Sequence, residues 1–236
     1  ADFNNDGLDD ISIPTNGERP FFFFKNDGIK LISQNFNLSY PFQVKQILWI
    51  DYDNDNDKDL YLTSFNGKNK LFENDGFFYF NDVTSLLNLP DSLSNSFGSS
   101  WADINNDGYI DLLQTYRTSD TLSNTIKIFL SDSALSFHEI TSTTNISELS
   151  KLPFCASFVD IDNNNLLDLY IANDKSSGNS MYYNNGNLSF NNISESSNTG
   201  VDMDAMSVTI GDFNNDQYFD IYSTNLEEGN KFFVNN

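Results

Sequence analysis

A ten-residue acidic motif recurs five times along the chain and constrains its fold more than any other feature. The motif has the form Asp-x-[Asp/Asn]-x-[Asp/Asn]-x-x-x-Asp-[Leu/Ile], and its copies span residues 2–11, 51–60, 103–112, 160–169 and 212–221. Successive copies begin 49, 52, 57 and 52 residues apart. A fixed period of this length is typical of repeat architectures, in which each repeat is one supersecondary unit that packs against its neighbours.

The same order of apolar segments surrounds each acidic loop. A first strand is expected before the loop at residues 46–50, 97–102, 154–159 and 206–211, and a second directly after it at 59–63, 111–116, 168–172 and 220–224. Third strands are expected at 69–76, 179–186 and 230–236, with looser copies at 22–28 and 126–132, and fourth strands at 77–84, 135–141 and 188–194. These segments are rich in β-forming residues and bounded by Asn, Gly and Ser turns.

Four short strands per period predict an all-β fold, namely a β-propeller of four-stranded blades with five loop repeats. A β-sandwich is the alternative, but it would not need the same loop at the same place in every period. The repeats are expected at residues 1–41, 42–93, 94–149, 150–201 and 202–236 of one propeller domain or fragment, with incomplete first and last blades. Five repeats are therefore expected as a lower bound for the ring.

Oxygen-bearing side chains at alternate loop positions form the pattern of a site for a hard cation. Calcium takes roughly six to eight oxygen ligands from carboxylates, amides and backbone carbonyls. We expect the side chains at positions 1, 3, 5 and 9 to converge, together with the carbonyl of position 7. The predicted ligands, for up to five Ca2+ ions, are Asp2, Asn4, Asp6, Leu8 and Asp10; Asp51, Asp53, Asp55, Asp57 and Asp59; Asp103, Asn105, Asp107, Tyr109 and Asp111; Asp160, Asp162, Asn164, Leu166 and Asp168; and Asp212, Asn214, Asp216, Tyr218 and Asp220.

Position 6 of each loop must form a sharp turn. Gly7 and Gly108 permit a left-handed backbone, and Asn56 and Asn165 accept one, whereas Gln217 is a poorer choice. The fifth loop is therefore the weakest candidate for an ion.

Two alternatives to this calcium loop are disfavoured. An EF-hand needs flanking helices and a Glu at position 12, where this chain has Ile13, Leu62, Gln114, Ile171 and Ser223. Acidic surface turns without an ion would leave converging carboxylates to repel each other.

These loops and strands resemble the FG-GAP/VCBS repeat β-propellers, a family that includes the head of the integrin α-subunit. Residues 103–112 match the family's calcium loop, and Phe97-Gly98 is similar to its Phe-Gly element. Residues 69–76 and 80–84 are closer to the bacterial VCBS and cartilage-acidic-protein-like repeats. The resemblance covers the whole chain and implies a ring of about seven blades, calcium in the loops, and a secreted or cell-surface location.

The net charge excludes nucleic acid as a partner and disfavours an anionic membrane surface. The chain has 12 Lys and Arg against 34 Asp and Glu, for a net charge of −22, and the five loops hold 18 of the acidic residues. Nucleic acids and anionic membranes both require clustered positive charge. No apolar run approaches the length of a membrane span. The single cysteine, Cys155, cannot form an internal disulfide, so metal is the expected source of extracellular stability.

Catalysis is not expected. The one histidine, His138, falls in an expected outer strand, no nucleophile elbow or phosphate-binding loop is present, and the loops account for most clustered carboxylates. We expect a calcium-binding extracellular module for adhesion or ligand binding, part of a larger secreted or surface protein, whose propeller face holds a protein or glycan. The alternative is a non-catalytic or weakly catalytic domain of a secreted carbohydrate-active protein, lectin-like or attached to a polysaccharide lyase.

Overall fold

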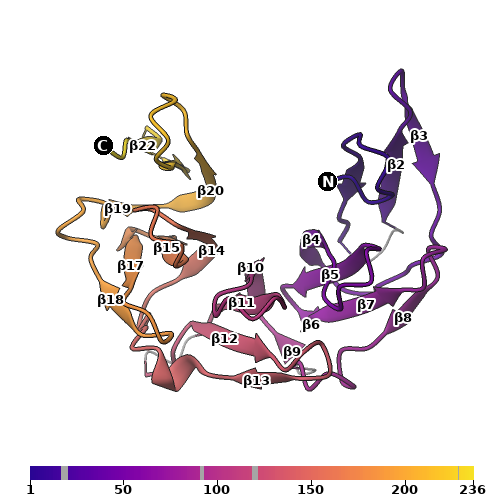
Figure 1. Ribbon diagram of the computed structural model, residues 1–236, viewed down its shortest axis with the longest axis horizontal. Helices are drawn as coiled ribbons and strands as arrows, with labels where there is room; N and C mark the ends of the chain where they lie inside the picture. The colour runs from indigo at the N-terminus through magenta and orange to yellow at the C-terminus, as the bar shows by residue number, and fades with distance from the viewer. Residues whose placement is uncertain (17–20, 91–92, 119–121, 228) are drawn as a thin grey trace. The chain divides into compact units, whose positions relative to one another are not determined.

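Five β-sheets follow one another along the chain in a computed structural model that describes residues 1–16, 21–90, 93–118, 122–227 and 229–236 (Figure 1). The first sheet has the order β1-β2-β3 and the fifth β20-β21-β22, while the three between them have four strands each. One short 3-10 turn, η1 (Thr141–Thr143), is the only helical element among the described residues.

The strands of each sheet run in chain order. The first sheet is β1 (Ile11–Ile13), β2 (Phe22–Asn26) and β3 (Leu31–Gln34); the second is β4 (Val44–Ile50), β5 (Asp59–Ser64), β7 (Lys70–Asn74) and β8 (Phe80–Asp82). The third is β10 (Ser96–Ala102), β11 (Asp111–Tyr116), β12 (Ile126–Ser131) and β13 (Phe137–Glu139); the fourth is β14 (Pro153–Val159), β15 (Asp168–Asn173), β17 (Ser180–Asn184) and β18 (Phe190–Asn192). The fifth is β20 (Ala205–Gly211), β21 (Asp220–Asn225) and β22 (Lys231–Phe233).

This succession confirms the predicted all-β arrangement of five propeller blades with four-stranded sheets. The fourth strands are shorter than expected, because a hairpin turn takes up their first residues, as at residues 77–79 before β8. Two short pairings were not predicted, β6 (Gly67–Lys68) with β9 (Leu93–Ser94) and β16 (Ser177–Gly178) with β19 (Asp202–Met203). The larger ring stays a prediction.

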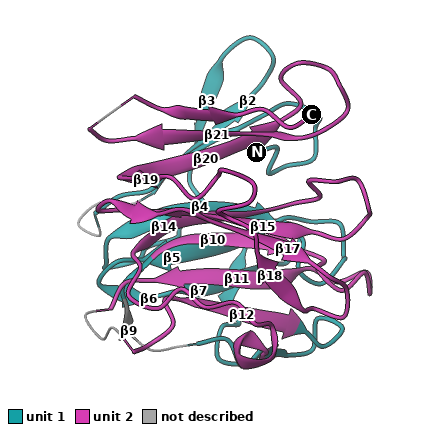
Figure 2. Cartoon of the chain, turned by 90° about the vertical axis from the view of Figure 1, so that its left-hand side faces the viewer, with its two compact units in different colours: residues 1–96, 131–138 teal, residues 97–130, 139–236 magenta. Residues whose placement is uncertain are grey.

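Two compact units divide the chain, residues 1–96 with 131–138 and residues 97–130 with 139–236 (Figure 2). The first unit has an aromatic core in which Phe3, Phe23 and Phe36 surround Trp49, whose indole N–H donates to Ser12 Oγ at 2.8 Å. The second unit has two mixed hydrophobic cores, one around Leu169 and Ile171 and one around Tyr170 and Ala172. Alternate residues of β15 thus enter different cores.

The second strand of each complete blade is the most deeply buried. Every residue of β5 and β15 is buried, so these strands read as continuous apolar runs that end in polar residues. Each begins with the ninth residue of an acidic loop. The burial of these strands therefore fixes one end of each loop.

The Phe-Gly pair of the third repeat lies where two first strands pack closely. A Cβ on Gly98 would be 2.8 Å from the Phe154 carbonyl oxygen, so only glycine fits without a shift of backbone. The rings of Phe97 and Phe154 lie 5.0 Å apart beside it.

Candidate metal centre

The five acidic loops share one hydrogen-bond frame, which begins at the position-1 aspartate. Its carboxylate accepts the backbone N–H of position 6 in every loop, at 2.8 Å for Gly7, 3.2 Å for Asn56, 2.8 Å for Gly108, 2.8 Å for Asn165 and 2.9 Å for Gln217. The position-5 side chain in turn accepts the backbone N–H of position 7 in all five, at 2.7 to 3.1 Å. Each loop is thus wound around its own acidic side chains.

The position-9 aspartate closes each loop. Its Oδ2 accepts the backbone N–H of position 2 in all five loops, at 3.0 to 3.2 Å. In four loops its Oδ1 accepts a second backbone N–H from an asparagine of the third-strand segment, namely Asn26, Asn74, Asn184 or Asn235. These aspartates were predicted as ligands, and the structure adds a role in holding the loop to the blade.

Two residues in every loop adopt a left-handed backbone. Position 6 does so as predicted, with φ of +86° at Gly7, +74° at Asn56 and +92° at Gly108, and Gln217 follows at +76°. Position 4 does so as well, with φ between 57° and 64°, and it is an asparagine in all five repeats. Sequence reasoning missed position 4, although its uniform asparagine was the available signal.

The position-4 asparagine also reaches the next loop. Asn5 Nδ2 donates to the Asn56 carbonyl at 2.8 Å, Asn106 Nδ2 to the Asn165 carbonyl at 3.3 Å, and Asn163 Nδ2 to the Gln217 carbonyl at 2.9 Å. In each case the acceptor is position 6 of the following loop. Neighbouring loops within a unit are therefore joined to each other.

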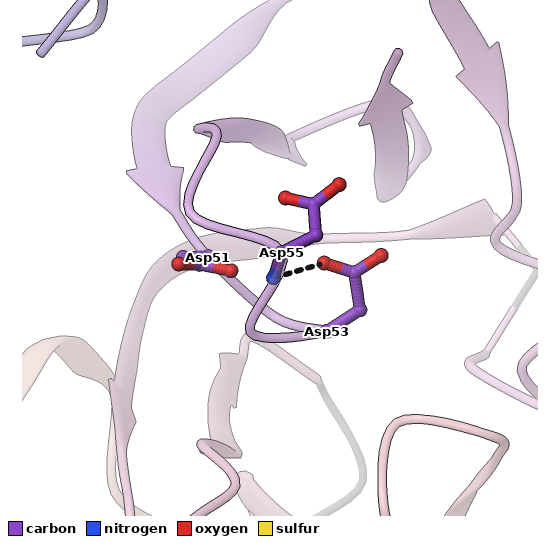
Figure 3. A group of neighbouring side chains, drawn as sticks. All are labelled: Asp51, Asp53 and Asp55. Carbon is purple, nitrogen blue, oxygen red and sulfur yellow. Dashed lines mark hydrogen bonds between the residues drawn. The ribbon is translucent and has the colours of Figure 1, made fainter. Parts of the chain in front are cut away.

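Two of the predicted ligand sets bring three carboxylates together. Asp51, Asp53 and Asp55 of the second loop each place a carboxylate oxygen within 4.8 Å of the others, and Asp160, Asp162 and Asp168 do so in the fourth. Figure 3 shows the first group on one tight loop, where the Asp55 backbone N–H donates to Asp53 at 3.3 Å. The other three loops have an asparagine at position 3, and their ligand-position carboxylates are at positions 1, 5 and 9.

Several side-chain oxygens of the acidic loops are buried without a hydrogen-bond donor, two of them on predicted side-chain ligands, Asn4 and Asp51. Among the described residues, Asn4 Oδ1, Asp51 Oδ1 and Asp57 Oδ1 accept no hydrogen bond. A buried acceptor without a partner is unfavourable by about 1 to 3 kcal/mol. Oxygens of this kind are suited to coordinate a hard cation, so the residues fit calcium.

Burial and the repulsion between neighbouring charges raise the pKa of carboxyl groups in the second loop. Burial raises the pKa of Asp59 to about 8, and Asp53 and Asp57 add to the shift, while the backbone N–H groups of Asn74 and Tyr52 oppose it. Burial, followed by the charges of Asp55 and its neighbours, raises the pKa of Asp57 to about 6. In the fourth loop burial raises the pKa of Asp168 to about 6. A bound cation would favour the ionised forms of all these groups.

In the first and fourth repeats, the residue of the neighbouring strand that lies opposite position 9 of the loop also contacts the loop. In the first loop Lys25 Nζ lies 2.9 Å from Asp6 Oδ2. In the fourth, the Tyr183 hydroxyl donates to Asp162 Oδ2 at 3.0 Å. Sequence reasoning missed both contacts, since they follow from strand register rather than from spacing within the loop.

Comparison with known families supports this interpretation of the repeats. The model of the FG-GAP-like repeat family matches residues 51–113 and 160–223, just over half of the chain. The chain belongs to the FG-GAP-like repeat family. Each matched segment begins at the first aspartate of an acidic loop and ends in the second strand of the next blade, β11 or β21. No curated protein is similar enough to the chain to count as a match.

Proposed function

We propose that this FG-GAP-like repeat protein is a calcium-binding extracellular module that holds a protein or glycan ligand. The buried loop oxygens without hydrogen-bond donors carry the calcium assignment. The family is typical of extracellular proteins and suggests a ligand-binding or adhesion-type role. Of the residues that the structure describes, none lies in a helix long and apolar enough to cross a bilayer.

Calcium would neutralise the clustered carboxylates and tie the start of each loop to its end. In the second loop Asp51, Asp53 and Asp55 would hold the ion, with the Asp57 carbonyl as a further ligand. In the fourth loop Asp160, Asp162 and Asp168 would hold it. The fixed aspartates at position 9 would then couple ion binding to the stability of the blade.

Equilibrium dialysis of resin-treated protein against calcium tests this proposal. We expect up to five ions per chain, and the double variant Asp51→Asn/Asp55→Asn should bind one ion fewer. Asp9→Asn is the matched control, because its carboxylate is 90% exposed and lies outside the predicted ligand set. Each site should add about 1.4 kcal/mol to the free energy of unfolding when free calcium is tenfold above Kd. Protein that binds no calcium would refute the proposal.

A groove in the first unit favours a glycan as the ligand. Its volume is about 590 Å3, and its lining includes the amide side chains of Asn35, Asn37 and Asn81 together with the aromatic side chains of Phe77 and Tyr79. Phe77 is 79% exposed and Tyr79 is 72% exposed. Amides offer a donor and an acceptor to vicinal hydroxyls, and an exposed ring can stack on the apolar face of a sugar.

Side-chain hydrogen bonds hold the hairpin tip that carries these aromatic residues. The Asp75 side chain accepts the backbone N–H groups of Phe77 at 2.9 Å and Tyr79 at 3.2 Å, and the Asn74 side chain accepts that of Phe78 at 2.9 Å. The groove lining contains no charged side chain among the described residues, which favours a neutral glycan over an acidic one.

Affinity electrophoresis in gels containing neutral polysaccharides tests the glycan assignment. The double variant Phe77→Asn/Tyr79→Ser introduces the residues that the fourth repeat has at the equivalent tip, Asn187 and Ser189. We expect it to lose at least about tenfold in affinity. Leu86→Asn, which removes a side chain that is 76% exposed outside the groove, should bind normally. Equal binding by the aromatic variant and the wild type would contradict the assignment.

We propose a role without catalysis in this chain. His138 lies on an exposed hairpin, where its Nδ1 is 3.0 Å from Asp132 Oδ2, and Ser136 Oγ donates to the same oxygen. The aspartate therefore separates the serine from the imidazole, so the imidazole does not activate the hydroxyl. β-Elimination of acidic polysaccharides by the purified protein would favour the alternative of a lyase domain.

A further inference from the structure

The first and third loops form a natural matched pair. Both have Asp, Asn and Asp at positions 1, 3 and 5, Asn at position 4, Gly at position 6 and Asp at position 9. Both also share the hydrogen-bond frame from position 1 to position 6, at 2.8 Å in each. Spacing and ligand type alone predict the same affinity for calcium in the two loops.

The two loops differ at position 8, where the first has Asp9 and the third Ile110, but Asp9 is 90% exposed and outside the predicted ligand set. They also differ in the residue that lies opposite position 9. The register of β1 with β2 pairs Ile11 with Phe24, so the next residue toward the loop is Lys25. The register of β11 with β12 pairs Leu112 with Phe129, so the equivalent residue is Leu130. By the same alignment the other repeats have Glu73, Tyr183 and Val234. Lysine is present only in the first.

The lysine lies among the predicted calcium ligands. Its Nζ is 2.9 Å from Asp6 Oδ2, and the negative charges of Asp10 and Asp2 also attract the ammonium. No Lys or Arg pairs with Asp103 or Asp107 in the part of the chain that the structure describes. The first loop therefore contains a positive charge supplied by the chain itself.

Hydrogen bonding inside the two loops differs accordingly. In the third loop Asn105 Nδ2 donates to Asp107 Oδ2 at 2.9 Å, and Asn105 Oδ1 accepts the Asp107 N–H at 3.1 Å. In the first loop the ammonium pairs with Asp6, and the Asn4 amide instead donates to Asp10 Oδ2 at 3.0 Å. In this orientation of the Asn4 amide, its Oδ1 is buried and accepts no hydrogen bond from the described residues.

We infer that Lys25 is a tethered ammonium that competes with calcium for the first loop, so that calcium binds this loop more weakly than the third loop and must displace the amine. The inference rests on the proposed calcium function. Calcium can displace the Lys25 ammonium from Asp6, because the side chains of Lys25 and Asp6 are 38% and 28% exposed and a lysine side chain is flexible. The loop carboxylates attract divalent calcium more strongly than they attract the ammonium, but the positive charge of Lys25 repels the ion and so lowers its affinity for the loop.

Calcium binding by charge-matched variants tests this inference. Lys25→Met and Lys30→Met each remove one positive charge from the same hairpin, but no contact joins the Lys30 side chain to an acidic loop among the described residues. Isothermal titration with calcium should show that Lys25→Met tightens the first-loop site about three- to tenfold, whereas Lys30→Met changes it less than twofold. Lys25→Arg, which keeps the charge, should behave like the wild type.

A second variant locates the effect in the first loop, and a melt in calcium-free buffer gives a readout that does not depend on the ion. Adding Asp2→Asn to Lys25→Met should abolish the gain in affinity, since Asp2 is a ligand of the first loop only. In calcium-free buffer Lys25→Met should melt at a lower temperature than Lys30→Met, because the first loop has lost its counter-ion. Wild-type protein that binds no calcium would overturn the proposed function and this inference together. Calcium binding that is the same in Lys25→Met and the wild type would overturn this inference alone.

Discussion

Stability of the calcium-free protein should fall as the pH rises from 5 to 7, and Asp59 is the main cause. Its side chain is 1% exposed at the start of β5, where burial raises its pKa to about 8 against a usual value near 3.8. Asp168, fully buried at the start of β15, has a pKa raised to about 6 for the same reason. Without a cation, the folded state therefore holds protons that the unfolded chain releases.

The sign and size of this effect follow from proton linkage. Below pH 3.8 both states are protonated and no stability is lost. Between 3.8 and the folded pKa the native state binds the extra proton, so the free energy of unfolding falls by about 1.4 kcal/mol per pH unit for each group. From pH 5 to 7, Asp59 alone lowers it by about 2 to 3 kcal/mol, and above pH 8 the fall ends. Asp168 contributes a smaller loss that ends near pH 6.

Thermal melts followed by circular dichroism measure this slope. For a chain of this size 2 to 3 kcal/mol corresponds to roughly 5 to 10 °C in Tm. The protein should be melted at steps of one pH unit from pH 5 to pH 8, once without calcium and once with about 2 mM calcium. This concentration exceeds the Kd of about 0.1 to 1 mM that is typical of extracellular calcium modules. With calcium the slope should reverse, because the ion binds ionised carboxylates.

Asp59→Asn isolates the contribution of one residue. The variant should lose most of the decline between pH 6 and 8 in calcium-free buffer, whereas the exposed Asp9→Asn should keep it. A calcium-free Tm that stays level or rises from pH 5 to 7 would refute the reasoning, as would an unchanged slope in Asp59→Asn.

Three further substitutions test the loops and the packing of the blades. Gly98→Ala should lower the free energy of unfolding in urea by about 1 to 3 kcal/mol, because its Cβ would meet the Phe154 carbonyl at 2.8 Å, whereas Gly229→Ala, with nothing within 4 Å, should be near neutral. Gln217→Gly should stabilise the fold by up to about 1 kcal/mol in the same assay, since it relieves a left-handed backbone at φ +76°; a loss of stability would contradict the assigned strain. Asn163→Gly keeps the backbone freedom at φ +60° but removes the bond to the Gln217 carbonyl, so amide exchange in the fifth loop should accelerate while the third loop exchanges as before.

The repeat pattern predicted the fold because it recurs in every period. Each loop forces the chain from a first strand into a second, and the second strands β5 and β15 are apolar enough to be buried at every position. The bulge near the start of the first strands, seen between Val44 and Gln46 and between Pro153 and Cys155, left no such signal. It depends on how paired strands twist rather than on composition.

The candidate site was predictable in its residues but not in its contacts. The spacing placed the position-9 aspartates in the ligand set, yet their hydrogen bonds to Asn26 or Asn184 join residues 16 apart and depend on the register of the third strand. Gln217 takes the turn that glycine favours because the Asp212 carboxylate accepts its backbone N–H at 2.9 Å, so a hydrogen bond within the loop outweighs the preference of the residue. The position of Lys25 over the first loop likewise required the pairing of β1 with β2.

The asparagine at position 4 also bears on how such a chain can lengthen during evolution. Asn106 and Asn163 each donate to the carbonyl at position 6 of the following loop. The fourth loop thus donates to the loop after it through Asn163 and accepts from the loop before it through the Asn165 carbonyl. A duplicated blade can join at any such junction without new contacts having to arise, whereas a fragment of a blade cannot. Gain and loss of repeats should therefore proceed in whole blades.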